Sequence, residues 1–242
     1  MSIINIDQAR ETAYQLSEAY KSIRTNIEFC GSDVKAIAIT SCTANEGKTT
    51  ASLNVAISLA DAGKKVLYID ADLRKSVIVG RYHIGQQIQG LSHFLSGKNT
   101  INDVLYPTSV KNLHMIVAGP VPPNPAELLG NRYFKGLMEA ARKSYDYIIV
   151  DLPPLGPVID AAVVAKECDG SILIVASGNV SYKFAQSVKL QLEKSGCRVL
   201  GVILNKVAFK DRGVFSKYYG KYYGGYYGDY GSYFKSEHKK SK

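Results

Sequence analysis

The loop Ser41-Cys-Thr-Ala-Asn-Glu-Gly-Lys-Thr-Thr50 carries side chains suited to holding phosphate groups. Its end matches the GK[ST] part of the phosphate-binding pattern GxxxxGK[ST], although Cys42 stands where that pattern has its first glycine. In such a loop the backbone N–H groups and a lysine meet phosphate oxygens, and a hydroxyl reaches Mg²⁺. We therefore predict that ATP binds here through Ser41, Thr43, Asn45, Glu46, Gly47, Lys48, Thr49 and Thr50.

Carboxylates follow two further apolar segments. Asp151 ends Tyr147-Ile-Ile-Val150, and Asp70 and Asp72 end Val66-Leu-Tyr-Ile69, with Arg74 close behind. Beside a phosphate loop, such groups could bind metal, accept a proton and balance the charge of a γ-phosphate. A strand-ending aspartate is also a common helix cap or turn residue, and the paired aspartates could form a solvated turn. We predict Lys48, Asp70, Asp72 and Arg74 as catalytic residues and Thr49, Asp70, Asp72 and Asp151 as metal ligands.

The last thirty residues gather eight tyrosines among glycines and lysines. From Ser216 to Lys242 there is no Leu, Ile, Val or Met, so this segment cannot form a packed core and we expect a flexible tail. A phosphoryl donor site joined to a strip of phenols predicts an enzyme that phosphorylates its own tail. The alternative is a low-complexity tail that aids solubility or stacks on nucleic acid. The tyrosines are Tyr218, Tyr219, Tyr222, Tyr223, Tyr226, Tyr227, Tyr230 and Tyr233.

Charge and cysteine content narrow the class of protein. From Lys206 onward nine basic and three acidic residues give +6 of the total +9, so the preceding body is close to neutral and no nucleic-acid surface is expected on it. The four cysteines show no metal-ligand spacing or disulfide framework, which favours a cytoplasmic location. No apolar run of about 18 residues is present, so we expect membrane contact to be peripheral.

The elements that must position these residues alternate between strands and helices. Strands are predicted at Ala36–Thr40, Lys65–Ile69, Tyr147–Val150, Ser171–Ala176 and Val199–Leu204, and helices at Glu11–Phe29, Thr49–Ala62, Phe134–Arg142 and Tyr182–Lys194. Continuously apolar strands separated by helices predict an α/β fold of the P-loop NTPase type, a mostly parallel sheet covered on both faces. We predict an N-terminal helical region at 1–33, a catalytic domain at 34–210 and a tyrosine-rich tail at 211–242.

Taken in order, the motifs resemble those of the bacterial tyrosine kinases of capsule and exopolysaccharide synthesis. Gly47-Lys-Thr-Thr50, Ile69-Asp-Ala-Asp-Leu-Arg74 and Ile149-Val-Asp-Leu-Pro-Pro154 resemble that family's Walker A, A′ and B motifs. The likeness extends to Gly119–Leu129, to Val158–Ala161 and to the tyrosine cluster. This resemblance implies a tyrosine autokinase that uses ATP and Mg²⁺.

The resemblance also implies partners. Glu18, Lys21 and Arg24 resemble the family's ExxRxxR segment, which joins neighbouring subunits in a ring, with Lys21 where that segment has arginine. An octamer-like ring would phosphorylate tails in trans and dissociate afterwards. A membrane adaptor of the polysaccharide co-polymerase type would hold the kinase at the inner face of the cell membrane. A phosphotyrosine phosphatase and other tyrosine substrates are implied as well.

Other roles for the site stay open. Asn205 occupies the position at which related P-loop ATPases contact adenine, although a strand-end Asn is often a plain turn former. Spacing does not decide whether Asp70 or Asp72 is the base. The rival functions are an ATPase switch like those of cell division and plasmid partition, and nucleic-acid binding by the tail. Those ATPases carry a lysine where this chain has Thr43, which favours the kinase.

Overall fold

The computed structural model describes residues 3–9, 14–84 and 88–207. The chain divides into two units, Met1–Asn205 and Lys206–Lys242. The predicted phosphorylation tyrosines lie outside the described residues, as do the first residues of the predicted N-terminal helix. The three predicted domain ranges stay predictions.

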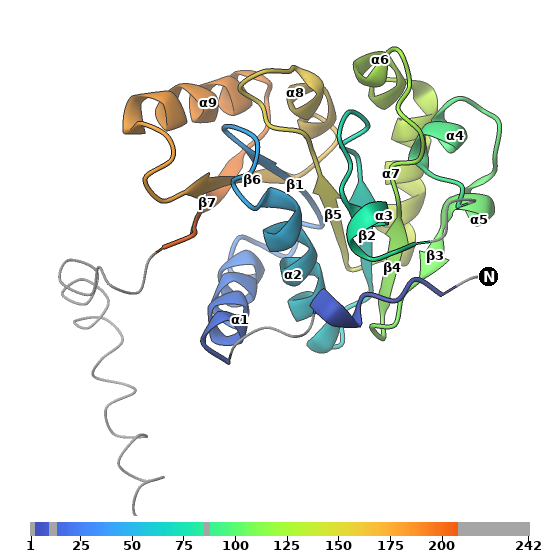
Figure 1. The fold of residues 1–242 in the computed structure, drawn as a ribbon, viewed down its shortest axis with the longest axis horizontal. Coiled ribbons are helices and arrows are strands. Elements are labelled where there is room, and N and C mark those ends of the chain that lie inside the picture. The colour runs from blue at the N-terminus through green and yellow to red at the C-terminus, as the bar shows by residue number, and fades with distance from the viewer. Residues whose placement is uncertain (1–2, 10–13, 85–87, 208–242) are drawn as a thin grey trace, which may run out of the picture. The chain divides into compact units, whose positions relative to one another are not determined.

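A sheet of seven strands forms the centre of the first unit, in the order β3-β4-β2-β5-β1-β6-β7 (Figure 1). All neighbouring strands in the described part are parallel except β3 and β4. The predicted α/β class is therefore confirmed. The strands are β1 (Ala36–Ser41), β2 (Val66–Asp70), β3 (Tyr106–Pro107), β4 (Leu113–Ile116), β5 (Tyr147–Asp151), β6 (Gly170–Ala176) and β7 (Val199–Asn205).

The prediction of five strands was wrong in number, because β3 and β4 were missed. β3 has only two residues, and His114 interrupts the short apolar run of β4. Neither offers the four to eight apolar or alternating residues by which a strand is identified from sequence. Both lie at one edge of the sheet, and the other five strands are those that the sequence predicted.

Helices cover both faces of this sheet, as predicted (Figure 1). One face packs against α1 and α2, and the other against α7, α8 and α9. Among the described helices none is long and apolar enough to cross a membrane. The helices are η1 (Asp7–Ala9), α1 (Tyr14–Glu28), α2 (Lys48–Asp61), α3 (Ile78–Arg81), α4 (Leu91–Leu95), α5 (Ile101–Val104), α6 (Pro125–Leu129), α7 (Arg132–Ser144), α8 (Asp160–Ala165) and α9 (Tyr182–Lys194).

The register of the central strands brings their polar ends together. β5 lies between β1 and β2, and its last residue, Asp151, is opposite Ile39 of β1 and Asp70 of β2. The loop from Ser41 leaves β1 at this same edge and leads into α2. In parallel α/β sheets ligands bind at the carboxyl ends of the strands. The sheet thus gathers the phosphate loop and the aspartates at one place.

Asp169 joins three elements at the other end of the strands, where β1 and β6 begin. Its Oδ2 accepts hydrogen bonds from the backbone N–H groups of Lys35 and Ala36, both at 2.8 Å, and from Arg142 Nη1 at 2.7 Å. Burial works to raise the pKa of Asp169, but the hydrogen bonds from Arg142, Ala36 and Lys35 outweigh it and lower the pKa below its ordinary value. These bonds hold the start of β1 against α7 and the strand β6 that follows Asp169.

We predict that Asp169→Asn lowers the free energy of unfolding by roughly 2 kcal/mol at pH 7, because the charged acceptor is lost. A lowered pKa stabilises the fold above the unfolded-state value of 3.8, and this stabilisation disappears as pH falls through the lower folded-state value. Urea unfolding from pH 7 to pH 3 should therefore show the difference narrowing below about pH 4. Glu139→Gln, on the exposed side of α7, is the control and should change little. An equal loss at both ends of the pH range would contradict this account.

Candidate active site

The phosphate loop takes a conformation that needs glycine at position 47. Gly47 has φ 84° and stands immediately before α2. A Cβ atom there would lie 2.2 Å from Asn205 Nδ2, so a side chain would be both strained and blocked. The loop therefore delivers the chain directly into α2, whose N-terminal N–H groups can meet an anion.

Two predicted nucleotide-binding residues support this loop from within the protein. The buried Glu46 carboxylate accepts hydrogen bonds from Thr43 N at 2.8 Å and Ala176 N at 3.2 Å. Asn205 Nδ2 donates to the Glu46 carbonyl oxygen at 2.8 Å. Thr43 Oγ1 accepts a further bond from Asn179. These hydrogen bonds hold the loop in place. It stays a prediction that Thr43 and Glu46 contact the nucleotide directly and that Asn205 contacts adenine.

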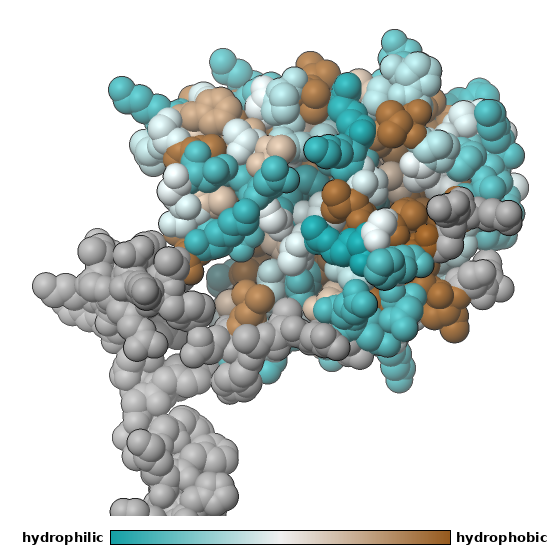
Figure 2. All heavy atoms as spheres, viewed as in Figure 1, coloured by the Kyte–Doolittle hydropathy of each residue, from teal (hydrophilic) through white to brown (hydrophobic). Residues whose placement is uncertain are grey.

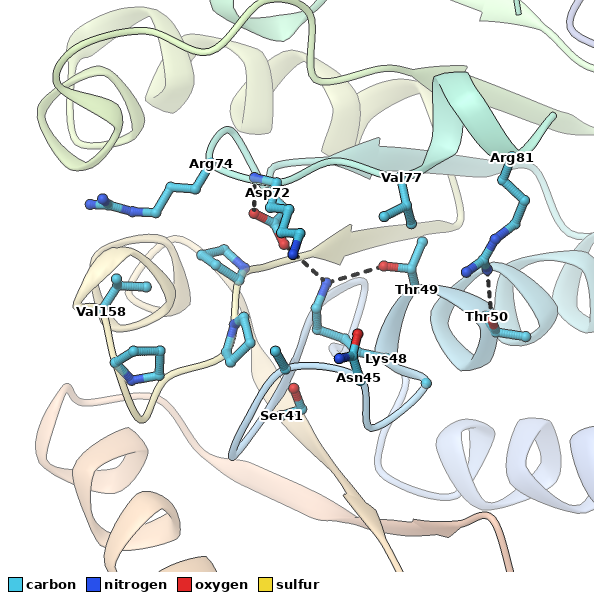
Figure 3. A pocket seen from close by; sticks show the side chains of 16 residues that line it. Ser41, Asn45, Lys48, Thr49, Thr50, Asp72, Arg74, Val77, Arg81 and Val158 are labelled. Carbon is cyan, nitrogen blue, oxygen red and sulfur yellow. Dashed lines mark hydrogen bonds and ion pairs between the residues drawn. The ribbon is translucent and has the colours of Figure 1, made fainter. Parts of the chain in front are cut away.

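A buried charge cluster lies where the loop meets β5. Lys48 Nζ is 2.8 Å from Asp151 Oδ1 and 3.7 Å from Asp72 Oδ2. Thr49 Oγ1 donates to Asp151 Oδ2 at 2.7 Å. Asp151 is fully buried and the Lys48 side chain is only 7% exposed. Figure 3 shows Lys48 pointing between Thr49 and Asp72. The lysine thus balances carboxylates that would otherwise be buried without a partner.

Asp70 and Asp72 differ in their surroundings. Asp70 is buried behind the cavity, where its carboxylate accepts hydrogen bonds from Ser76 Oγ and from Asp72 N. Burial raises the pKa of Asp70 to about 7, helped by the charge of Asp151 and opposed by Ser76 and Lys48. Asp72 lines the cavity instead, and its Oδ1 accepts a bond from Lys75 N at 3.0 Å. Only Asp72 of this pair is placed to reach a substrate directly.

Arg74 is held by a residue whose role the sequence did not reveal. Its Nε and Nη2 bond to the two carboxylate oxygens of Asp160, with 3.0 Å between Nη2 and Oδ1. Asp160 is fully buried at the start of α8. The segment Val158–Ala161 had been noted for its family likeness, but spacing gave no sign of this pairing. The charge of Arg74 is therefore compensated, and its catalytic role stays a prediction.

These residues surround a cavity of about 240 Å³. It is lined by the loop and the first turn of α2, by the segment from Asp72 to Arg81 and by the segment from Pro153 to Val158. Arg81 was not foreseen as a site residue; its Nη1 donates to Thr50 Oγ1 at 2.7 Å. The wall residues of the loop that match the prediction are Ser41, Asn45, Gly47, Lys48, Thr49 and Thr50.

The structure brings together fewer oxygen ligands for Mg²⁺ than the four that were predicted. Within the described ranges no three His, Cys, Asp or Glu residues are arranged to hold a metal ion. Mg²⁺ usually takes one or two carboxylates and completes its shell with water and substrate phosphates. Thr49 Oγ1 and Asp151 Oδ2 form such an oxygen pair. The ligand roles of Asp70 and Asp72 stay predictions.

The predicted oligomerisation residues make contacts within their own chain. Lys21 Nζ lies 2.7 Å from Glu18 Oε1, on the same face of α1. Arg24 Nη1 donates to the Ser58 carbonyl oxygen of α2 at 3.0 Å. The bond from Arg24 attaches α1 to the helix that begins at the phosphate loop, while the pair of Lys21 and Glu18 lies within α1.

Comparison with known proteins agrees with this geometry. Residues 34–182 match the AAA domain family. The tyrosine-protein kinase CpsD of Streptococcus agalactiae serotype Ia is 44% identical over 203 residues, which cover 84% of this chain and 88% of that protein. The crystal structure of the chimerical protein CapA2B2 has a TM-score of 0.77 at 31% identity, covering 86% and 95% of the two chains. MinD of Pyrococcus horikoshii in complex with Mg-ADP has a TM-score of 0.63 at 25% identity, covering 74% and 72%.

The fold and the loop define a nucleotide-binding AAA domain of the P-loop class. Within that class, the chain belongs to the bacterial tyrosine-protein kinases related to CpsD. It is an enzyme that transfers a phosphoryl group from ATP to protein tyrosine, as the resemblance implied.

We predict that Asp70→Asn stabilises the nucleotide-free and metal-free protein at pH 8. A carboxyl whose pKa is raised from 3.8 to about 7 destabilises the fold once pH exceeds the unfolded-state value, by at most about 4 kcal/mol. Thermal unfolding in a chelator should show a higher melting temperature for the variant at pH 8 and a shrinking difference toward pH 4. Asp72→Asn provides the comparison at the cavity wall. A variant that melts lower than wild type at pH 8 would contradict the assignment.

Proposed function

We propose that this kinase phosphorylates its own C-terminal tyrosine cluster and thereby regulates the polymerisation and export of a capsular polysaccharide or exopolysaccharide. The observation that carries this proposal is the buried Lys48–Thr49–Asp151 cluster beside the phosphate loop, in a chain that ends in eight closely spaced tyrosines. A kinase site and a dense set of acceptors in one chain favour self-phosphorylation.

The loop from Ser41 to Thr50 is proposed to hold the phosphates of ATP. Lys48 would leave its ion pair with Asp151 and pair with the β- and γ-phosphates, because these carry more negative charge than one carboxylate. Thr49 and Asp151 would hold Mg²⁺, which would neutralise charge on the β- and γ-phosphate oxygens when bound. The Mg-ADP complex of the MinD relative supports this choice of cofactor.

The acceptor phenol has an ordinary pKa near 10 and so is protonated at neutral pH. We propose that Asp72, which lines the cavity, orients the phenol and takes its proton, while Asp70 lies behind it. The phenolic oxygen forms a bond to the γ-phosphorus as the bond to the β-phosphate oxygen breaks. ADP leaves, and the tail retains the phosphoryl group.

We infer that transfer occurs in trans within an octamer-like ring, because a neighbour's tail is then held at high effective concentration. The family resemblance of Glu18, Lys21 and Arg24 supports this assembly. Each phosphate adds about −1.5 to −2 charge, so a few would reverse the +6 of the tail and favour dissociation of the ring.

An activating membrane adaptor of the polysaccharide co-polymerase type is proposed to hold the kinase at the inner face of the cell membrane. A cognate phosphatase would reset the tail, and other tyrosine proteins could serve as substrates. Cell fractionation tests the adaptor: the kinase should leave the membrane fraction when that membrane protein is deleted, and unchanged fractionation would count against it.

The rival proposal is that the domain acts as an ATPase switch and does not phosphorylate its own tail, which the fold likeness to MinD favours. Nucleic-acid binding by the basic tail is the other alternative. The first predicts ATP turnover without phosphotyrosine, and the second predicts salt-sensitive binding that is lost with the tail.

We predict successive phosphate additions to Tyr218 through Tyr233 when the purified chain is incubated with Mg·ATP. Intact mass and peptide mapping measure them, with the adaptor's cytoplasmic peptide added in a parallel sample. Lys48→Met should lose at least about 100-fold in rate, because the phosphate-binding cation is removed. A chain truncated after Ser216 should turn over ATP without accepting phosphate. ATP turnover with no tail phosphate under either condition would favour the switch.

Transfer in trans is tested by mixing full-length Lys48→Met with the truncated, active chain. Phosphate should appear on the inactive full-length chain, since it alone carries the tail tyrosines. Native mass measurements should show a large assembly before incubation with Mg·ATP and smaller species afterwards. No phosphate on the Lys48→Met chain at any concentration, while active full-length chains incubated alone do phosphorylate their tails, would contradict transfer in trans.

A further inference from the structure

Two arginines lie at opposite ends of the cavity, with Lys48 between them (Figure 3). Arg74 is bound through two of its nitrogens to the buried carboxylate of Asp160. A phosphate that recruited Arg74 would have to compete with that ion pair and would leave Asp160 buried without a partner. Nucleotide binding through Arg74 would therefore cost free energy.

Arg81 is placed differently. It ends α3 and lines the cavity, and its Nη1 donates to the neutral hydroxyl of Thr50. Within the described part of the chain no carboxylate lies within ion-pair distance of Arg81. Burial raises the pKa of the adjacent Tyr82 phenol, so that neighbour is neutral too. The guanidinium thus keeps its charge uncompensated beside a loop built for anions.

The anchor of Arg81 also indicates which part of the nucleotide it faces. Thr49 bonds to Asp151, and Lys48 approaches Asp151 and Asp72. The proposed catalytic and metal-binding carboxylates thus lie around Lys48 and Thr49. Thr50 is the next residue along α2 and holds Arg81 at the side of the cavity away from Arg74 (Figure 3). A cation there is suited to a phosphate that stays on the nucleotide after transfer.

We propose that Arg81 is a nucleotide-binding residue, whose guanidinium pairs with a phosphate oxygen that ADP retains, with Thr50 holding it in position. This inference rests on nucleotide binding in the Ser41–Thr50 loop, but not on which tyrosine is phosphorylated. Its planar fork of donors suits a phosphate better than a lysine does. Figure 2 shows hydrophilic side chains interspersed over the viewed face, so an exposed cation alone is not distinctive; the anchor and the cavity are what distinguish Arg81.

The test is calorimetric titration of the full chain with Mg·ADP and with a non-hydrolysable Mg·ATP analogue. Arg81→Ala should weaken both ligands by a similar factor of roughly 10 to 20, the lower part of the range for a charge-assisted contact. Arg81→Lys should recover part of the loss, and raising the salt concentration should reduce the difference between wild type and Arg81→Ala. Arg132→Ala, an exposed arginine on α7, is the matched control and should bind both ligands like wild type.

In steady-state phosphorylation, Arg81→Ala should raise KM for ATP by a similar factor with kcat within about twofold of wild type, because a uniformly bound phosphate affects ground and transition states alike. Unchanged affinity for ADP, or a fall in kcat with unchanged KM, would overturn the proposal. Melting curves exclude a folding defect. If wild type binds ADP but phosphorylates no tail tyrosine, the self-phosphorylation proposal fails while the assignment of Arg81 can still be judged from the titrations.

Discussion

The ion pair between Lys48 and Asp151 joins the phosphate loop to the centre of the sheet. Both groups are buried, and each would be expensive to bury alone, so the loop and β5 are held to one relative position. Thr49 adds a second bond to the same carboxylate. The loop geometry, the cavity and the placement of the neighbouring aspartates all follow from this attachment.

The rest of the fold serves to keep these charges close. β5 lies between β1 and β2, so three strand ends meet at Asp151, while Glu46 and Asn205 secure the loop from the side of β6 and β7. The cost of this crowding appears at Asp70, whose pKa burial raises to about 7. A site that destabilises its own unliganded form is well suited to bind a metal ion, because the cation relieves the repulsion between these carboxylates.

Sequence reasoning predicted five of the seven strands, the fold class and the loop, because a buried strand, a loop that ends in Gly-Lys-Thr-Thr and a helix each have local signatures. It also brought Lys48, Thr49, Asp151 and Asp72 to one place. It could not show that Arg74 pairs with Asp160, 86 positions away, or that Ser76 bonds to Asp70. Nor could it reveal that the Glu46 carboxylate points toward the backbone of Thr43 and Ala176. Such pairings depend on three-dimensional packing between segments that have no common periodicity.

The central claim is that the ion pair of Lys48 marks the place where nucleotide phosphates bind. A crystal structure of the full chain with Mg·ADP tests it most directly. Our account predicts that Lys48 Nζ leaves Asp151 Oδ1 for a phosphate oxygen, with Thr49 and Asp151 next to the metal ion. A structure in which ADP occupies another cavity, or in which Lys48 stays on Asp151 beside a fully bound nucleotide, would contradict it.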